Sequence, residues 1–133
     1  MAFVIYHNPD CSISRNVVRY AQEAHANPIV IEYLKDWWTQ AQLLGLFAAA
    51  DVTPVEALRR TRSPAEELGL LNETDPEILI NAMVEHPILV NRPFVCTSKG
   101  VKLCRPAETV FEVLQLPTGQ NFLKEDGDLA YKS

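Results

Sequence analysis

One polar loop near the start of the sequence carries a cysteine among residue types that bind and activate anions. The loop reads His7-Asn8-Pro9-Asp10-Cys11-Ser12-Ile13-Ser14-Arg15 and follows the apolar run 2–6. A helical pattern begins near Ser14, so Cys11 is expected at a helix N-terminus. Free backbone N–H groups and the helix dipole favour negative charge there, and the same field lowers the pKa of a thiol. The loop therefore predicts a nucleophilic thiolate beside a binding place for an anion.

Three polar neighbours are candidates for tuning the sulfur of Cys11. His7 or Arg15 would lower its pKa further, and the hydroxyl of Ser14, one turn away, could donate to the thiolate. Each also has an ordinary structural interpretation. Ser14 can be a plain N-cap, Arg15 a solvated charge, and His7 a strand-end residue packed on the helix.

The residues around Cys11 separate the chemistries that a cysteine in this position can perform. A local dithiol motif requires a second cysteine where Ser14 stands, so any resolving thiol must come from elsewhere. A cysteine phosphatase loop requires an arginine where Val17 stands. A buried structural cysteine fits poorly with so polar a loop. A catalytic monothiol is the interpretation that remains best supported.

Three distant positions offer arginines that could bind an oxyanion. They are Arg59 or its neighbour Arg60, Arg92 and Arg105. A tetrahedral oxyanion with two negative charges requires convergent guanidinium groups to leave water. Taken singly, each arginine is more often a surface charge than a ligand, and sequence spacing does not show whether the fold brings them together.

The elements expected around the loop follow the order βαβ, helices, ββα. Strands are expected at residues 2–7, 28–33, 94–97 and 101–104, and helices at 14–25, 39–50, from Thr53-Pro54, at 63–71, 75–85 and 106–114. The first βα loop of such a unit opens at the carboxyl end of the strands, where ligands bind. The polar segment 117–133 receives no firm structure and is expected to wrap the surface or to be a loose tail.

Size, charge and cysteine content limit the class of protein. With 133 residues, 47% of them hydrophobic, the chain 1–133 is expected to form one domain. A net charge of −5 argues against nucleic-acid and anionic membrane surfaces. No signal peptide and no apolar run near the about 20 residues of a membrane span are visible, so a cytoplasmic location is expected. The cysteines at 11, 96 and 104 have no metal-ligand spacing, so no metal site is predicted. Cys96 is expected in the core, whereas Cys104 either packs there or faces Cys11 and resolves it.

Several motifs spread along nearly the whole chain resemble one known family. They are Tyr6-His7-Asn8-Pro9 with Cys11-x-x-Ser14-Arg15, Glu66-Glu67-Leu68-Gly69-Leu70, His86-Pro87-Ile88-Leu89-Val90-Asn91-Arg92-Pro93, Leu103-Cys104-Arg105-Pro106 and Lys124-Glu125-Asp126-Gly127. Together they resemble the glutaredoxin-coupled arsenate reductases of bacteria. The resemblance implies an α/β, thioredoxin-like fold with a small mixed sheet and a helical insertion, and a cis peptide bond before Pro93.

The resemblance also implies roles for individual residues. Cys11 would be the nucleophile, with His7, Ser14 and Arg15 tuning its sulfur. The oxyanion would be held by Arg59, Arg92 and Arg105, and Arg59 is preferred to Arg60 only because Leu58-Arg59 aligns with the family pattern.

The reaction implied by the resemblance is reduction of arsenate to arsenite. The Cys11 thiolate would attack arsenate, glutathione would act as a co-substrate thiol, and glutaredoxin would clear the mixed disulfide, with no bound cofactor. A monomer is expected. Ile13 departs from the family pattern and is a place where docking of the thiol donor could differ.

A second hypothesis is a non-catalytic or regulatory thioredoxin-fold redox sensor that is glutathionylated at Cys11. Regulators of this fold usually carry Cys-x-x-Cys in the loop, which Ser14 excludes. Poorly characterised reductase-like relatives often lack the segment Leu103-Cys104-Arg105-Pro106, which this chain has. Both features favour the enzyme.

Overall fold

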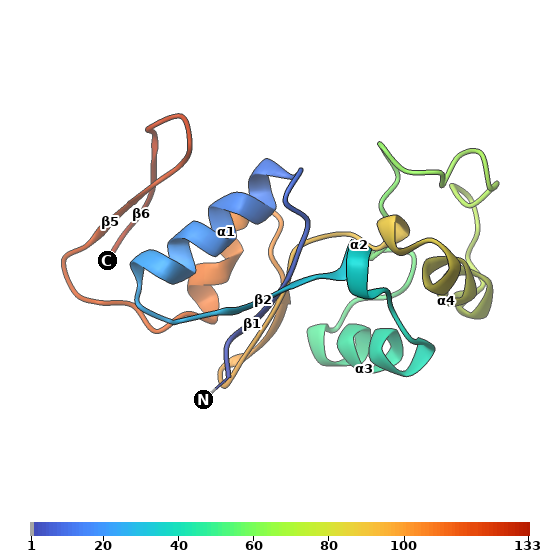
Figure 1. Cartoon of the computed structure of the whole chain (residues 1–133), viewed down its shortest axis with the longest axis horizontal. Helices are drawn as coiled ribbons and strands as arrows, with labels where there is room; N and C mark the ends of the chain where they lie inside the picture. The colour runs from blue at the N-terminus through green and yellow to red at the C-terminus, as the bar shows by residue number, and fades with distance from the viewer. Residues whose placement is uncertain (1) are drawn as a thin grey trace. The chain divides into compact units, whose positions relative to one another are not determined.

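The cysteine loop follows the first strand of a four-stranded mixed sheet in the computed structural model, which describes residues 2–133 (Figure 1). The chain divides into two compact units. The first combines the residues up to Glu32 with Arg92–Ser133, and the second is Tyr33–Asn91. The first unit contains the sheet and the cysteine loop, and the second contains most of the helical insertion.

The sheet of the first unit has the strand order β2-β1-β3-β4. Its strands are β1 (Val4–His7), β2 (Ile29–Glu32), β3 (Phe94–Thr97) and β4 (Gly100–Leu103). β1 pairs parallel with β2 and antiparallel with β3, and β3 pairs antiparallel with β4.

The register of the three central strands determines which residues meet at one edge of the sheet. Tyr6 is opposite Phe94, and Phe94 is opposite Leu103. The end of β1, the start of β3 and the end of β4 therefore lie together. This edge holds the cysteine loop after β1, the Arg92-Pro93 dipeptide before β3 and the Cys104-Arg105 dipeptide after β4.

Helix α1 (Ser12–Glu23) lies beside the 3-10 helix η2 (Ala107–Glu112) in the first unit (Figure 1). The buried positions of α1 recur at helical spacing and include Val17 and Tyr20, as expected of a helix that buries one face. The core that they join contains Phe3, Ile5, Val17, Tyr20, Ala21, Val95, Cys104, Ala107, Val110, Phe111, Val113, Leu114 and Phe122. This packing holds α1, and with it the cysteine loop, against the sheet.

The C-terminal segment forms a two-stranded antiparallel hairpin, β5 (Asn121–Leu123) and β6 (Leu129–Lys132), although its polar composition gave no prediction of a strand. Phe122 is fully buried between the rings of Tyr20 and Phe111, whose centroids lie 6.2 and 5.1 Å away. Tyr131 also stacks on Phe111, with ring centroids 4.4 Å apart. Aromatic burial of this kind is a large apolar contribution, so Phe122 is a main anchor of the hairpin on α1 and η2.

The second unit consists of α2 (Tyr33–Asp36), α3 (Gln40–Ala50), α4 (Pro76–Glu85) and the 3-10 helix η1 (Pro87–Leu89). Thr39 caps α3 with a complete capping box, and Asp75 caps α4 by accepting a hydrogen bond from the N–H of Glu77. These two helices confirm the predictions made from their capping residues.

The predictions of two other helices in the insertion, from Thr53-Pro54 and at residues 63–71, are wrong. Thr53 forms a capping box with Glu56, but the chain then leaves the helical path, because Leu58 bridges to Val90. After Ser63, a single turn ends at Gly69, whose φ of +71° is the left-handed conformation that terminates helices. The predicted closing helix after Pro106 is the short 3-10 helix η2 instead of an α-helix.

The observed elements confirm the predicted fold class, an α/β βαβ…ββα arrangement with a small mixed sheet flanked by helices. Among residues 2–133, no helix has the length and apolar character required to cross a bilayer.

Candidate active site

Cys11 is the N-cap residue of α1. The helix begins at Ser12, two residues earlier than the sequence pattern predicted. Its backbone is extended, with φ −104° and ψ 121°, and its carbonyl oxygen accepts the first helical hydrogen bond from Arg15 N–H at 3.0 Å. The N–H of Cys11 donates to the carbonyl oxygen of Asn8 at 3.1 Å. The residue is 8% exposed, so the sulfur is held at the helix N-terminus with little contact to water.

The pKa of the Cys11 thiol is lowered from its ordinary value. Burial alone would raise it, but the backbone N–H groups of Ser14 and Ile13 and the guanidinium of Arg92 favour the thiolate more strongly. Arg92 acts both by its charge and by a side-chain hydrogen bond to the sulfur. The activation of the sulfur therefore depends on the helix N-terminus, as the sequence predicted, and on an arginine that the sequence had assigned to the oxyanion.

Arg105 is a second arginine beside the sulfur. Its Nη1 is 3.9 Å from Cys11 Sγ and donates to the carbonyl oxygen of Arg92 at 3.1 Å. The N–H of Cys104 donates to the carbonyl oxygen of Pro93 at 2.8 Å, which joins the segment before β3 to the segment after β4. The Arg92-Pro93 and Arg105-Pro106 peptide bonds are both cis, and only the first was expected. Two guanidinium groups thus meet at one thiolate.

His7, at the end of β1, and Ser14, in the first turn of α1, form a buried pair. Ser14 Oγ lies 2.6 Å from His7 Nδ1 and accepts a hydrogen bond from the N–H of Asn8 at 3.1 Å. Burial lowers the pKa of His7, with a further decrease from Arg15 and an opposing increase from Glu32. We therefore assign a neutral ring whose Nδ1 accepts the Ser14 hydroxyl hydrogen. In this arrangement the Ser14 hydroxyl orients His7 and Asn8, while its backbone N–H serves the sulfur.

Arg15 has one hydrogen-bond partner within the cysteine loop and another in the C-terminal hairpin. Its Nη1 donates to the carbonyl oxygen of Pro9 at 3.0 Å, and its Nε and Nη2 each lie 3.3 Å from a carboxylate oxygen of Glu125. Glu125 belongs to one of the motifs that carry the family resemblance, but no role at the site was predicted for it. An Asp126-Gly127 turn between two short apolar stretches was the signal that could have identified a hairpin there.

The other two cysteines differ from Cys11 in their environment. Cys96, in β3, is partly buried, and burial raises its thiol pKa. Cys104 is fully buried in the core cluster, and burial raises its pKa to about 12. A thiol attacks as the thiolate, so the environment of Cys104 favours packing over the resolving role that the sequence left open.

Arg59 and Arg60 belong to the second unit. Arg59 is buried, with its Nε donating to the carbonyl oxygen of Thr61 at 3.0 Å, whereas Arg60 is exposed and donates to the carbonyl oxygen of Leu71 at 2.6 Å. The assignment of Arg59 to the oxyanion stays a prediction.

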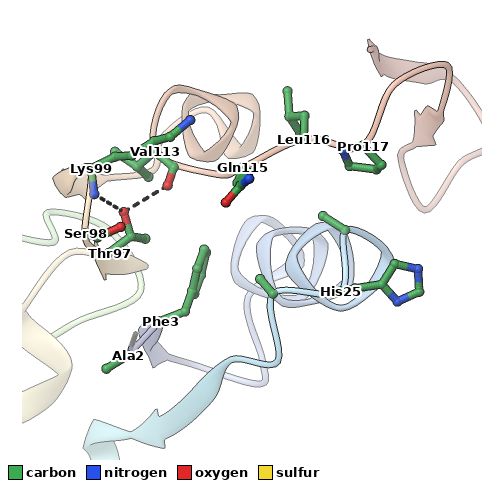
Figure 2. A pocket seen from close by; sticks show the side chains of 12 residues that line it. Ala2, Phe3, His25, Thr97, Ser98, Lys99, Val113, Gln115, Leu116 and Pro117 are labelled. Carbon is green, nitrogen blue, oxygen red and sulfur yellow. Dashed lines mark hydrogen bonds between the residues drawn. The ribbon is translucent and has the colours of Figure 1, made fainter.

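An open cavity of about 490 Å³ lies elsewhere in the first unit (Figure 2). It is lined by the residues just before β1, the residues after α1, the β3–β4 turn and the segment after η2, including Phe3, His25, Lys99 and Leu116. Cys11 follows the opposite end of β1, so this cavity is separate from the thiolate. Residues 2–133 contain no group of three or more histidine, cysteine, aspartate or glutamate side chains suited to hold a metal ion.

The chain is similar to known proteins over almost all of its length. The model of the ArsC family matches residues 6–113. An arsenate reductase of Synechocystis sp., ArsI2, is 62% identical over 128 residues, which cover 95% of this chain and 91% of the relative. An arsenate reductase of Escherichia coli (strain K12) is 42% identical over 126 residues, covering 93% and 89%.

Solved structures give the same result. The arsenate reductase from Vibrio cholerae superposes with a TM-score of 0.78 at 34% identity, covering 86% of this chain and 98% of that one. The family model extends over the thiolate loop and over both arginine-bearing segments of the sheet edge. The chain therefore belongs to the ArsC family.

Proposed function

We propose that this protein is an arsenate reductase that uses the Cys11 thiolate as its nucleophile, with glutathione and glutaredoxin as thiol donors. The observation that carries the proposal is a buried cysteine whose thiol pKa is lowered and whose sulfur meets the guanidinium groups of Arg92 and Arg105. Relatives that are 62% and 42% identical over most of the chain are named arsenate reductases, which supports the same substrate here.

In the first step the thiolate of Cys11 attacks the arsenic of arsenate. A sulfur–arsenic bond forms, and an arsenate oxygen leaves as water after taking up protons. Arg105 and Arg92 offer N–H donors and positive charge to the arsenate oxygens beside the sulfur. The same charges that stabilise the thiolate thus also bring the anion to it.

In the second step glutathione supplies the other sulfur. A sulfur–sulfur bond forms between glutathione and Cys11, and arsenic keeps the electron pair of the broken sulfur–arsenic bond. Arsenic is reduced from the pentavalent to the trivalent state and leaves as arsenite. Glutaredoxin then takes the glutathionyl group and returns Cys11 to the thiol. An external thiol is required because Ser14 occupies the local resolving position and the Cys104 thiol is protonated in the core.

The proposal is tested by measuring arsenite formed from arsenate in the presence of glutathione, glutaredoxin, glutathione reductase and NADPH. Wild type is compared with Cys11→Ser, and Cys96→Ser is the matched control, because Cys96 is a partly buried cysteine whose thiol pKa is raised. We expect turnover in wild type and in Cys96→Ser, and its loss in Cys11→Ser.

Turnover that persists in Cys11→Ser would overturn the assignment of the nucleophile. A Cys11 that becomes glutathionylated while no arsenite forms would overturn the enzymatic proposal and favour the redox sensor. The two outcomes are distinguished by intact-protein mass spectrometry of the same reaction mixtures.

A further inference from the structure

The C-terminal segment follows helix α1 from its end to its beginning. Three contacts connect them, at successive turns of the helix. They join Gln120 Nε2 to the carbonyl oxygen of Glu23 at 3.2 Å, the carbonyl oxygen of Leu123 to Arg19 Nη2, and Glu125 to Arg15. The last contact is at the helix N-terminus that carries Cys11.

The contact between Glu125 and Arg15 fixes the direction of the whole guanidinium group. Arg15 Nε and Nη2 are each 3.3 Å from one oxygen of the Glu125 carboxylate. A guanidinium group is planar and rigid, so an acceptor that engages two of its nitrogens determines where the third one points. The third nitrogen, Nη1, donates to the carbonyl oxygen of Pro9 at 3.0 Å.

The carbonyl group of Pro9 belongs to the loop that turns the chain from β1 into Cys11. Asn8 organises the loop from within, since its carbonyl oxygen accepts from Cys11 N–H and its Oδ1 accepts from Asp10 N–H at 2.9 Å. Arg15 ties the middle of this loop to the first turn of α1. The backbone N–H groups of that turn are among the groups that lower the pKa of Cys11.

The pair is too exposed to matter mainly for stability. The side chains of Arg15 and Glu125 are 44% and 41% exposed, and exposed ion pairs contribute little to the free energy of unfolding. A bidentate contact in this position instead restricts the geometry of the loop. We propose that Glu125 is a positioning residue for the Cys11 nucleophile, acting through Arg15 and the carbonyl group of Pro9.

Glu125 does not touch the sulfur, so its effect is expected in the reactivity of Cys11. In Glu125→Ala the loop gains freedom, and the sulfur spends less time over the N–H groups of the first turn of α1. The rate constant for iodoacetamide alkylation of Cys11 at neutral pH is expected to fall about threefold to tenfold, because small displacements of reacting groups are costly. The pH profile of alkylation should shift to higher pH, while the melting temperature changes little.

The matched control is Glu108→Gln. Glu108 forms an ion pair with Lys124 at 3.4 Å, so this variant removes a charge pair from the same hairpin turn without touching Arg15 or the loop. Its alkylation profile is expected to match that of wild type. Glu125→Gln keeps the length of the side chain but not the charge. Its rate constant for alkylation of Cys11 should lie between those of wild type and Glu125→Ala.

A further pair of variants tests the route through Arg15. Arg15→Lys keeps the positive charge but lacks the rigid fork, so it should reproduce the effect of Glu125→Ala. In the double variant Arg15→Lys/Glu125→Ala, alkylation of Cys11 should be no slower than in the slower of the two single variants, since both substitutions break the same connection. Additive losses in the double variant would overturn the proposed route.

The inference rests on the proposed role of Cys11, but alkylation is measured without arsenate. A failure of arsenate reduction is therefore distinguishable from a failure of this inference. An unchanged or faster alkylation of Cys11 in Glu125→Ala would overturn the positioning role, and a faster reaction would mean that Glu125 restrains the thiolate. If alkylation slows equally in Glu125→Ala and in Glu108→Gln, the effect belongs to the hairpin in general, and the positioning role of Glu125 is overturned as well.

Discussion

The guanidinium group of Arg105 lies beside the sulfur of Cys11, with Nη1 3.9 Å from Sγ, although 94 positions separate the two residues in the chain. The contact exists because β3 lies between β1 and β4 in the sheet and is antiparallel to both, so that β1 and β4 end at the edge where β3 begins. A helix N-terminus alone favours a thiolate, but two guanidinium groups at the same place also favour an oxyanion. The sheet register is therefore what turns a reactive cysteine into a site for an anionic substrate.

Replacing Arg92 is expected to affect the thiol itself. Arg92 lowers the pKa of Cys11 by its charge and by a hydrogen bond, so the pKa rises in Arg92→Ala and the thiolate fraction at neutral pH falls. Alkylation of Cys11 followed from pH 5 to 10 should shift to higher pH. An unshifted profile would restrict Arg92 to binding of the oxyanion, as the sequence had suggested.

Replacing Arg105 is expected to affect the anion more than the thiol. Its Nη1 lies at the far limit of a contact with sulfur and donates at 3.1 Å to the carbonyl oxygen of Arg92. In Arg105→Ala, kcat/KM for arsenate should fall by about 100-fold, as on removal of one donor from an oxyanion site. The alkylation profile of Cys11 should change less than in Arg92→Ala. A larger change in alkylation than in kcat/KM would reassign Arg105 to thiol activation.

Much of the cysteine loop could be predicted from local sequence. A short strand, a polar loop and a helical pattern are sufficient to place Cys11 at a helix N-terminus, where the structure has it. The role of Arg92 in lowering the pKa of Cys11 was not predictable in this way. It depends on the strand register, which sequence spacing does not specify.

The insertion shows where local signals fail. Thr53 and Glu56 form the capping box that their spacing predicts. The helix nevertheless ends after one turn, because the N–H of Arg59 donates to the carbonyl oxygen of Leu89 and Leu58 bridges to Val90. Pairing with a distant segment supplied the hydrogen bonds that a longer helix would have used. A capping signal therefore predicts where a helix begins and not how long it is.

Removing the Ser14 hydroxyl should destabilise the protein. Its Oγ bonds to His7 Nδ1 at 2.6 Å and to Asn8 N–H at 3.1 Å, and all three residues are buried. Ser14→Ala leaves a buried donor and a buried ring nitrogen unsatisfied, which should lower the free energy of unfolding in urea by about 1–3 kcal/mol. Ser12→Ala is the control, because Ser12 is exposed in the same helical turn. Equal stability of the two variants would contradict the proposed hydrogen-bond arrangement.

The burial of His7 predicts that the stability of the protein depends on pH. Burial is the main cause that lowers the pKa of His7 below its ordinary 6.5. The unfolded chain therefore binds a proton more readily than the folded one, so His7 contributes a stability that is present above pH 6.5 and is lost as the pH falls through its folded pKa. In His7→Gln the free energy of unfolding, measured in urea, should depend less on pH between 7 and 5. A dependence equal to that of wild type would contradict the role of His7.

The hairpin should depend on the burial of Phe122. This side chain is fully buried between Tyr20 and Phe111, whereas the next residue, Leu123, is 47% exposed. Phe122→Ala removes a large apolar side chain and leaves a cavity, so the free energy of unfolding should fall by about 3–5 kcal/mol, whereas Leu123→Ala should change it by less than about 1 kcal/mol.

The same two variants connect the hairpin to the thiol. Phe122→Ala releases the anchor that holds Glu125 near Arg15, so alkylation of Cys11 in the folded variant should slow as it does in Glu125→Ala. Leu123→Ala keeps the backbone carbonyl group that accepts a hydrogen bond from Arg19. Cys11 should be alkylated in this variant at the rate of wild type. Trypsin digestion provides an independent readout, because detachment of the hairpin exposes the chain around Lys124. Phe122→Ala with an intact hairpin and unchanged alkylation would show that the tail reaches α1 without this anchor.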